Sequence, residues 1–153
     1  MNIVLQKTYD VEPAIGLAGQ LVGHSDIDSV SKAAEGVIGF GKVVSRGTDK
    51  NLQCVLGGSE VLGVSIRDIN REVNATTGEA EYNDGEQVAI LRVGTLFVRV
   101  ASGVTAGDTA CYNTTTGEIK PGTAGASEAD LVGMYFDSNA SAGGVAKLRV
   151  RGL

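Results

Sequence analysis

Short runs of β-forming residues recur from Gly36 to the end of the chain, and this spacing limits the fold more than any other feature. The runs lie about ten residues apart between clusters of Gly, Asn, Asp and Thr, which is typical of a β-sandwich or β-barrel. The 22 glycines among 153 residues fit this pattern, because glycine favours turns and bulges over helix interiors. The sequence therefore predicts an all-β protein with a small antiparallel domain that is barrel-like or sandwich-like.

Three runs place their apolar side chains on one face of a strand: 61–67, 95–100 and 145–151. Such alternation predicts antiparallel strands with one face buried. Less regular strand candidates cover residues 38–45, 52–56, 87–93, 109–112 and 131–136. Gly94 lies between two of the candidates and indicates either a reversal or a bulge.

Residues 1–35 differ from the body because their apolar residues follow no sustained period. We therefore expect an extended N-terminal arm, 1–35, attached to a β-barrel-like body, 36–153. Residues 29–35 are compatible with one or two helical turns that end at Gly36. The apolar side chains near the start favour an arm that is ordered against a partner. The candidate contact residues are Ile3, Val4, Leu5, Lys7, Tyr9, Asp10, Ile15 and His24.

Charge and hydropathy exclude several classes of partner. The net charge of −5 does not provide the positive field that nucleic-acid binding requires. No apolar stretch approaches the roughly 18 residues of a membrane span, and the start lacks a signal-peptide pattern, so we expect a soluble cytoplasmic product. Cys54 and Cys111 are then expected to be reduced thiols buried in strands, with a single disulfide between them as the alternative.

The residues of an active site are not evident. His24 is the only histidine, and between Gly23 and Ser25 it fits a solvated loop or an interface hydrogen bond better than a general base. No spacing of a metal site is present, so no metal or cofactor is expected. The glycine-rich segment 36–42 ends in a lysine but lacks the following Ser or Thr of a phosphate-binding loop. We therefore predict a non-enzymatic protein.

Carboxylate pairs and a repeated hexapeptide also have simple explanations. The pairs Glu79 with Glu81 and Asp84 with Glu86 lie in a polar stretch, where acidic residues are normally solvated. The form N-x-T-T-G-E occurs at 74–79 and 113–118, but the flanking sequences differ, so two similar turns are predicted instead of a repeat.

Eight segments carry a resemblance to a known family. They are YDVEP (9–13), AAEGVIGFGKVV (33–44), LGVSIRD (62–68), YNDGEQVA (82–89), GTLFVRV (94–100), VTAGD (104–108), GMYFD (133–137) and AGGVAKL (142–148). Their order and spacing, over nearly the whole chain, resemble the structural cement (capsid decoration) proteins of tailed phages.

The resemblance implies a β-barrel-like homotrimer on the outer surface of the icosahedral head, made in the host cytoplasm and without a cofactor. Its partner would be a major capsid protein with the HK97-type fold. It would bridge neighbouring capsid subunits and stabilise the shell against internal DNA pressure, with the arm residues named above as contacts to the capsid or to other copies. The alternative is a phage tail or fibre-associated β-domain that binds host carbohydrate, although four tyrosines and no tryptophan offer few stacking groups. A small hydrolase would need a catalytic constellation that the sequence does not present.

Overall fold

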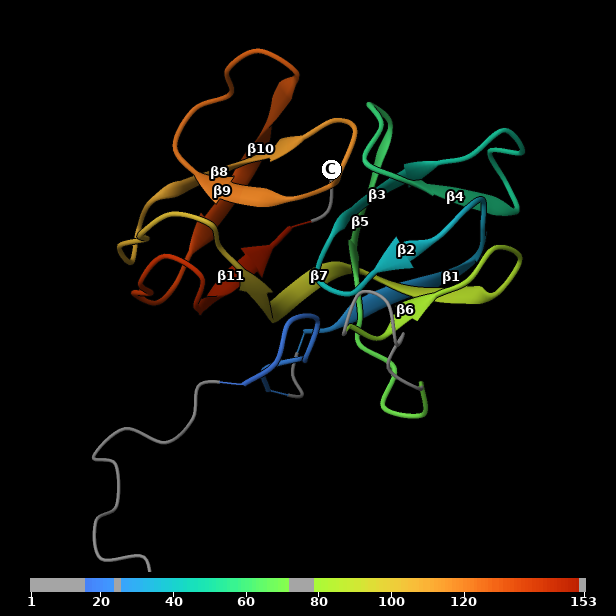
Figure 1. Cartoon of the computed structure of the whole chain (residues 1–153), viewed down its shortest axis with the longest axis horizontal. Helices are drawn as coiled ribbons and strands as arrows, with labels where there is room; N and C mark the ends of the chain where they lie inside the picture. Colours follow the sequence, from blue (N-terminus) through green and yellow to red (C-terminus); the bar gives the residue numbers. More distant parts are fainter. Residues whose placement is uncertain (1–15, 24–25, 72–78, 152–153) are drawn as a thin grey trace, which may run out of the picture.

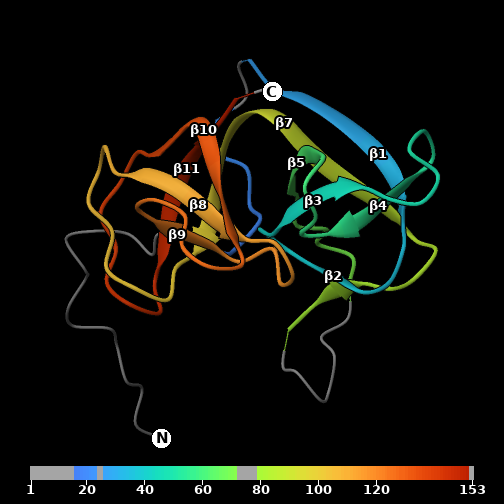
Figure 2. The same ribbon diagram turned by 90° about the horizontal axis from the view of Figure 1, so that it is seen from above.

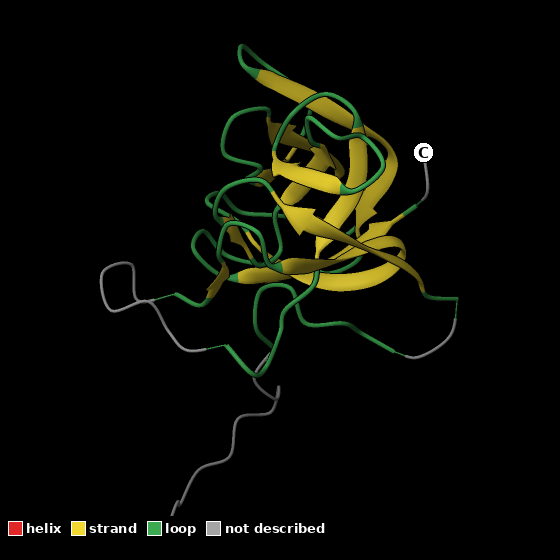
Figure 3. Cartoon of the chain, turned by 90° about the vertical axis from the view of Figure 1, so that its right-hand side faces the viewer, coloured by secondary structure: helices red, strands yellow, loops and turns green. Residues whose placement is uncertain are grey.

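The computed structural model describes residues 16–23, 26–71 and 79–151, and every regular element within them is a strand (Figure 1 and Figure 3). This confirms the all-β prediction. The strands are β1 (Asp28–Ala34), β2 (Ile38–Gly39), β3 (Val43–Arg46), β4 (Gln53–Leu56), β5 (Val61–Ser65), β6 (Glu81–Tyr82), β7 (Gln87–Arg99), β8 (Thr109–Asn113), β9 (Ile119–Pro121), β10 (Glu128–Phe136) and β11 (Val145–Val150).

Five strands close into a barrel in the order β1-β4-β3-β5-β7, with β7 pairing back onto β1. The closing pair is antiparallel and runs from Asp28↔Val93 to Ala33↔Gln87. On its other side, β1 is parallel to β4 through Ala33↔Gln53 and Ala34↔Cys54. Closure pairs the backbone groups that an open sheet would leave exposed at its edges.

The one or two helical turns with which residues 29–35 were compatible are not formed, because residues 29–34 belong to β1. Val30, Lys32 and Ala34 share one face, and both Val30 and Ala34 contact the interior of the barrel. The two-residue period was therefore present in the sequence. Pairing with β7 and β4 decides the conformation of a segment that is too short to form a stable helix alone.

The second half of β7 belongs to another antiparallel sheet, in the order β7-β11-β10-β8-β9. The reversal considered at Gly94 is wrong, because β7 is continuous and Gly94 pairs in register with Val150 of β11. A bulge is present two residues earlier: the pairs Asp28↔Val93 and Ser29↔Leu91 leave Arg92 without a partner on β1. The free edge of this sheet is β9, and its Pro121 has no N–H to offer another strand.

Two cores hold these sheets together. The barrel interior contains Ala34, Ile38, Phe40, Val44, Cys54, Ala80, Tyr82, Val88 and Ile90. Val43, Val64 and Leu91 alternate with interior residues, so they lie on the outer wall of the barrel, where they pack against buried residues of the second sheet such as Leu148. The two sheets therefore form one packed body (Figure 2).

An aromatic contact and two tyrosine hydrogen bonds stabilise the barrel and connect it to the second sheet. The short β2–β6 pair places Phe40 and Tyr82 in the barrel core, with their rings edge to face at a centroid distance of 5.3 Å. The Tyr82 hydroxyl donates to the Ile66 carbonyl at 2.8 Å. The Tyr112 hydroxyl, from the second sheet, donates to the Gly58 carbonyl at 2.6 Å and so connects the sheet to the barrel.

Both cysteines are buried free thiols, Cys54 on β4 and Cys111 on β8. Burial raises the pKa of Cys54 to about 11 and also raises the pKa of Cys111. Since the thiolate is the reactive form of cysteine, neither thiol is activated near neutral pH.

Part of the predicted arm contacts the body. The Gly19 N–H donates to the Phe97 carbonyl at 2.7 Å, and the Phe97 N–H donates to the Gln20 carbonyl at 2.9 Å. The Val22 N–H donates to the Thr95 carbonyl at 2.9 Å. Residues 19–22 therefore cover the side of β7 that β11 does not. The division of the chain at residue 36 stays a prediction.

Two buried serines, on the neighbouring barrel strands β3 and β5, are expected to respond differently to replacement by alanine. The Ser65 hydroxyl donates to the Gly39 carbonyl at 2.6 Å and accepts from the Lys42 N–H at 3.0 Å, whereas the buried Ser45 hydroxyl has no hydrogen-bond partner among the residues that the structure describes. We expect Ser65→Ala to lower the free energy of unfolding by about 1–3 kcal/mol, because the groups at Gly39 and Lys42 lose a partner. Ser45→Ala removes an unsatisfied group and is expected to leave stability unchanged or raise it by about 1 kcal/mol. Urea unfolding of both variants measures the difference, and equal destabilisation would contradict it.

Candidate contact surface

The sequence predicted eight contact residues, all within the first 24 positions of the chain. Ile3, Val4, Leu5, Lys7, Tyr9, Asp10, Ile15 and His24 all lie outside the described residues. Their role therefore stays a prediction. The structure does show how residues 16–23 of the predicted arm contact the body, and which surfaces lie beside them.

Two glycines fix the chain at the start of the described region. A Cβ atom on Gly16 would lie 2.6 Å from Phe97 Cε2, and one on Gly19 would lie 2.8 Å from the Arg67 backbone nitrogen. Both positions also have positive φ, 128° and 81°, which favours glycine. The Arg67 N–H donates to the Gly19 carbonyl at 2.8 Å. This segment is therefore seated closely on β7 and on the end of β5.

A hollow of about 200 Å³ lies beside this segment and carries an excess of positive charge. We call it the basic hollow; it is lined by Leu17, Ala18, Phe40, Lys42, Arg67, Glu79, Ala80 and Arg99. The Arg67 guanidinium lies 5.3 Å from the centroid of the Phe40 ring, a cation–π arrangement. Lys42 Nζ lies 3.6 Å from Glu118 Oε1. Arg99 is exposed and forms no ion pair within 16–23, 26–71 and 79–151.

A second hollow of about 210 Å³ adjoins the first, because Lys42 and Arg99 line both. Its charges are largely paired: Lys120 Nζ lies 2.5 Å from Glu128 Oε1. Lys120 holds the pKa of Glu128 below its ordinary value of 4.5, with help from the Gly125 N–H. The cations without an ion pair in the described part of the chain are Arg67, which lines only the basic hollow, and Arg99, which lines both hollows.

A braced loop, residues 67–71, follows β5 and presents an apolar side chain. Arg71 Nε lies 3.2 Å from Asp68 Oδ2, Arg71 Nη1 pairs with Glu86, and the guanidinium lies 5.0 Å from the centroid of the Tyr82 ring. Hydrogen bonds from the Asn83 backbone first, and from Arg71 second, hold the pKa of Glu86 below its ordinary value. Ile69 extends from this loop with 87% of its surface exposed.

Other exposed aliphatic side chains belong to segments outside the braced loop. Leu17 is 54% exposed at the basic hollow, and Val132 is 75% exposed on β10 of the second sheet. Single exposed apolar residues are common on proteins. Ile69 differs because the loop that carries it is held by several charged and aromatic contacts. The sequence contained this signal, since Ile69 stands alone between Asp68 and Asn70 in a polar stretch.

The described residues offer no arrangement for metal binding or membrane crossing. No group of three or more His, Cys, Asp or Glu side chains in them is close enough to hold a metal ion. Among them there is also no helix of the length and hydropathy needed to traverse a bilayer. The glycine-rich segment 36–42 folds as β2 and a turn, in which Ser65 bonds Gly39 and Lys42. The carboxylates considered above have structural partners: Glu86 pairs with Arg71, and both Glu79 and Glu81 are engaged.

Comparisons with known proteins found one matching family model and several solved structures of similar fold. The family model described as "Structural cement protein (E217 gp24/Pam3 gp6)" matches residues 5–151. A chain of the solved structure "The capsid of Myoviridae Phage XM1" is similar in fold, with a TM-score of 0.73 and 16% identity over 97% of this chain and 98% of that chain. The head fibre gp8.5 N base of bacteriophage phi29 gives a TM-score of 0.48 and 13% identity, covering 81% of this chain and 93% of that chain. No curated protein matches the chain significantly.

Proposed function

The chain belongs to the structural cement protein family of phages, and on that premise we propose that it binds the outer surface of the icosahedral head and bridges neighbouring major capsid subunits. The observation that carries the proposal is the family match over 5–151, which takes in most of the arm and nearly all of the body. We further propose that the protein is made in the host cytoplasm, assembles as a homotrimer and binds a coat protein with the HK97-type fold.

The proposed mechanism is mechanical and needs no chemical step. A protein that binds the assembled lattice, and binds free coat subunits less well, stabilises the lattice by mass action. Bridges across many subunit joints would then oppose bursting under internal DNA pressure. Three linked contacts in each trimer would add avidity, because the second and third contacts form at a high effective concentration.

Features of the body support this role. The barrel is closed and shares an extensive apolar core with the second sheet, so the body can hold its contact sites in fixed positions. The net charge of −5 suits the outside of the head better than its DNA-filled interior. We propose that Ile69, on the braced loop, is one of the apolar contacts with the coat.

Purified full-length protein mixed with expanded empty shells of its own phage tests the function. We expect saturation at a copy number set by the icosahedral symmetry, together with a higher temperature of shell disruption. Protein that stays unbound in co-sedimentation, while binding a glycan array, would instead support the tail or fibre alternative.

The variant Ile69→Ser tests the contact site in the same assay. Burying an isoleucine contributes about 1.5–3 kcal/mol, so we expect shell binding to weaken roughly ten-fold or more. Its free energy of unfolding should stay within about 0.5 kcal/mol of wild type, because the side chain is exposed. Val132→Ser, at an exposed residue of the second sheet, is the matched control and is expected to bind normally. Equal binding by both variants would remove Ile69 from the contact.

A further inference from the structure

We propose that the basic hollow is the receptor for residues 9–12 of a neighbouring copy of this chain. The inference rests on the proposed function, since it names the partner surface of the arm. It assigns Asp10 and Glu12 of one copy to the cations Arg67 and Arg99 of the next, with Tyr9 and Val11 facing the apolar wall.

The charge of the hollow is the first argument. The hollow contains three cationic side chains and one carboxylate on a protein whose net charge is −5. The Arg67 guanidinium lies 5.3 Å from the centroid of the Phe40 ring, and neither Arg67 nor Arg99 forms an ion pair in the described part of the chain. Guanidinium groups bind carboxylates through paired N–H donors, so two carboxylates are the matching ligand.

The apolar wall of the hollow is the second argument. Leu17, Ala18, Phe40 and Ala80 line it together with the cations, and more than half of the surface of Leu17 is exposed. A ligand that fits must therefore present apolar and acidic groups within a few residues. The sequence Tyr9-Asp10-Val11-Glu12 alternates these two classes, and the following Pro13 disfavours helical backbone at Glu12. A segment with a two-residue period presents its apolar groups on one side and its carboxylates on the other.

The position of Gly16 favours a neighbouring copy over the same chain. Leu17 and Ala18 already line the hollow, and Gly16 packs against the Phe97 ring. Only residues 13–15 separate Glu12 from Gly16, so the chain would have to reverse completely within them to occupy its own hollow. The four residue steps from Gly16 to Glu12 span at most about 14 Å when extended, so the hollow of the next copy is expected to lie within that distance of Gly16.

This exchange gives each copy both a donor and a receptor. A contact in which the arm of one copy fills the hollow of the next is heterologous, and it closes into a ring when the rotation between copies is suitable. A closed ring of three would leave no hollow empty. The exchange would therefore stabilise the proposed trimer and would add links between the copies on the shell.

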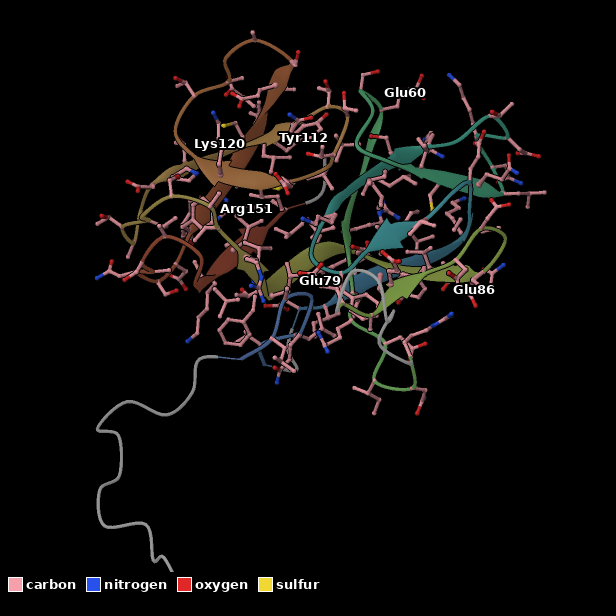
Figure 4. All side chains as sticks on the ribbon, in the orientation of Figure 1. Glu60, Glu79, Glu86, Tyr112, Lys120 and Arg151 are labelled. Carbon is pink, nitrogen blue, oxygen red and sulfur yellow. The ribbon has the colours of Figure 1, made fainter. Side chains whose placement is uncertain are left out.

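Cysteine pairing between two different variants tests the exchange. One preparation carries Glu12→Cys and the other Arg99→Cys; they are mixed at high concentration, free and on shells, under mild oxidation. We expect a disulfide between the two kinds of copy, at least ten-fold more abundant than with Glu60→Cys in place of Arg99→Cys. Glu60 lies between β4 and β5, away from Glu79 of the basic hollow (Figure 4). The native thiols are buried, so they contribute little background.

Two results would overturn the inference. The first is no excess of the mixed disulfide over the Glu60→Cys control, either free or on shells. The second is a disulfide that forms within single chains of the Glu12→Cys/Arg99→Cys double variant, with none between copies, which would assign the hollow to its own arm. Wild-type shell binding, measured in parallel, separates this question from the function: binding without the mixed disulfide contradicts the exchange alone, and the mixed disulfide without binding contradicts the cement role alone.

Discussion

Replacing Gly63 by alanine is expected to unfold the protein or to lower its free energy of unfolding by at least about 4 kcal/mol, near the top of the range for single substitutions. A Cβ atom at Gly63 would lie 2.0 Å from the Leu91 carbonyl oxygen and 2.8 Å from its carbonyl carbon. These are backbone atoms of β7, so no side chain can move aside to make room. β5 pairs with β7 next to this point, at Val64↔Leu91, so the strands would separate where the barrel wall meets the second core.

Gly103→Ala is the matched control for this effect. Gly103 is exposed, has no positive φ, and the nearest atom to an added Cβ is the Ala140 oxygen at 3.9 Å. We expect its free energy of unfolding to stay within about 0.5 kcal/mol of wild type. Urea unfolding followed by circular dichroism compares the two variants. A Gly63→Ala protein with the wild-type midpoint would mean that β5 and β7 do not approach as closely as described.

Local sequence pattern was enough to predict where three of the strands lie. The runs 61–67, 95–100 and 145–151 appear as β5, the second half of β7 and β11. β11 buries alternate residues as predicted, whereas β5 buries the adjacent residues Val64 and Ser65, so the prediction of one buried face is wrong for that strand. β1 was missed because Ser, Lys and Ala have little preference for strands, so the period of Val30, Lys32 and Ala34 was weak. Its conformation is determined by pairing with β7, some 60 residues away in the sequence.

The basic hollow could not be predicted from local sequence pattern, for a related reason. Lys42 precedes β3, Arg67 follows β5 and Arg99 ends β7, so only the sheet topology brings the three cations together. Topology depends on pairings between distant segments, which a single sequence does not specify. The sequence shows Ile69 as a single apolar residue in a polar stretch. It does not show that the loop around Ile69 is held in place, because Arg71 pairs both with Asp68 of that loop and with Glu86 of a different loop.

Deletion of residues 1–35 is expected to abolish cooperative folding, which is a large effect for a segment that the sequence suggests is an accessory arm. The deletion removes β1, the strand that closes the barrel between β4 and β7. It would also expose the interior around Val88 and Ile90, which Ala34 and Val30 help to cover. The side of β7 that residues 19–22 occupy would lose its partner as well. Loss of the cooperative urea transition measures this outcome, and a folded fragment 36–153 would contradict it.

Deletion of residues 1–15 is the matched experiment, and it is expected to give the opposite result for folding. All the contacts of 16–23 and β1 remain, so the free energy of unfolding should change by no more than about 1 kcal/mol. If the arm supplies contacts with the coat or with neighbouring copies, shell binding should nevertheless fall at least ten-fold, because the avidity of the linked contacts is lost. A fragment 16–153 that folds and binds shells as tightly as the full chain would show that the body alone carries the binding energy, and would turn attention to Ile69 and the surface around it.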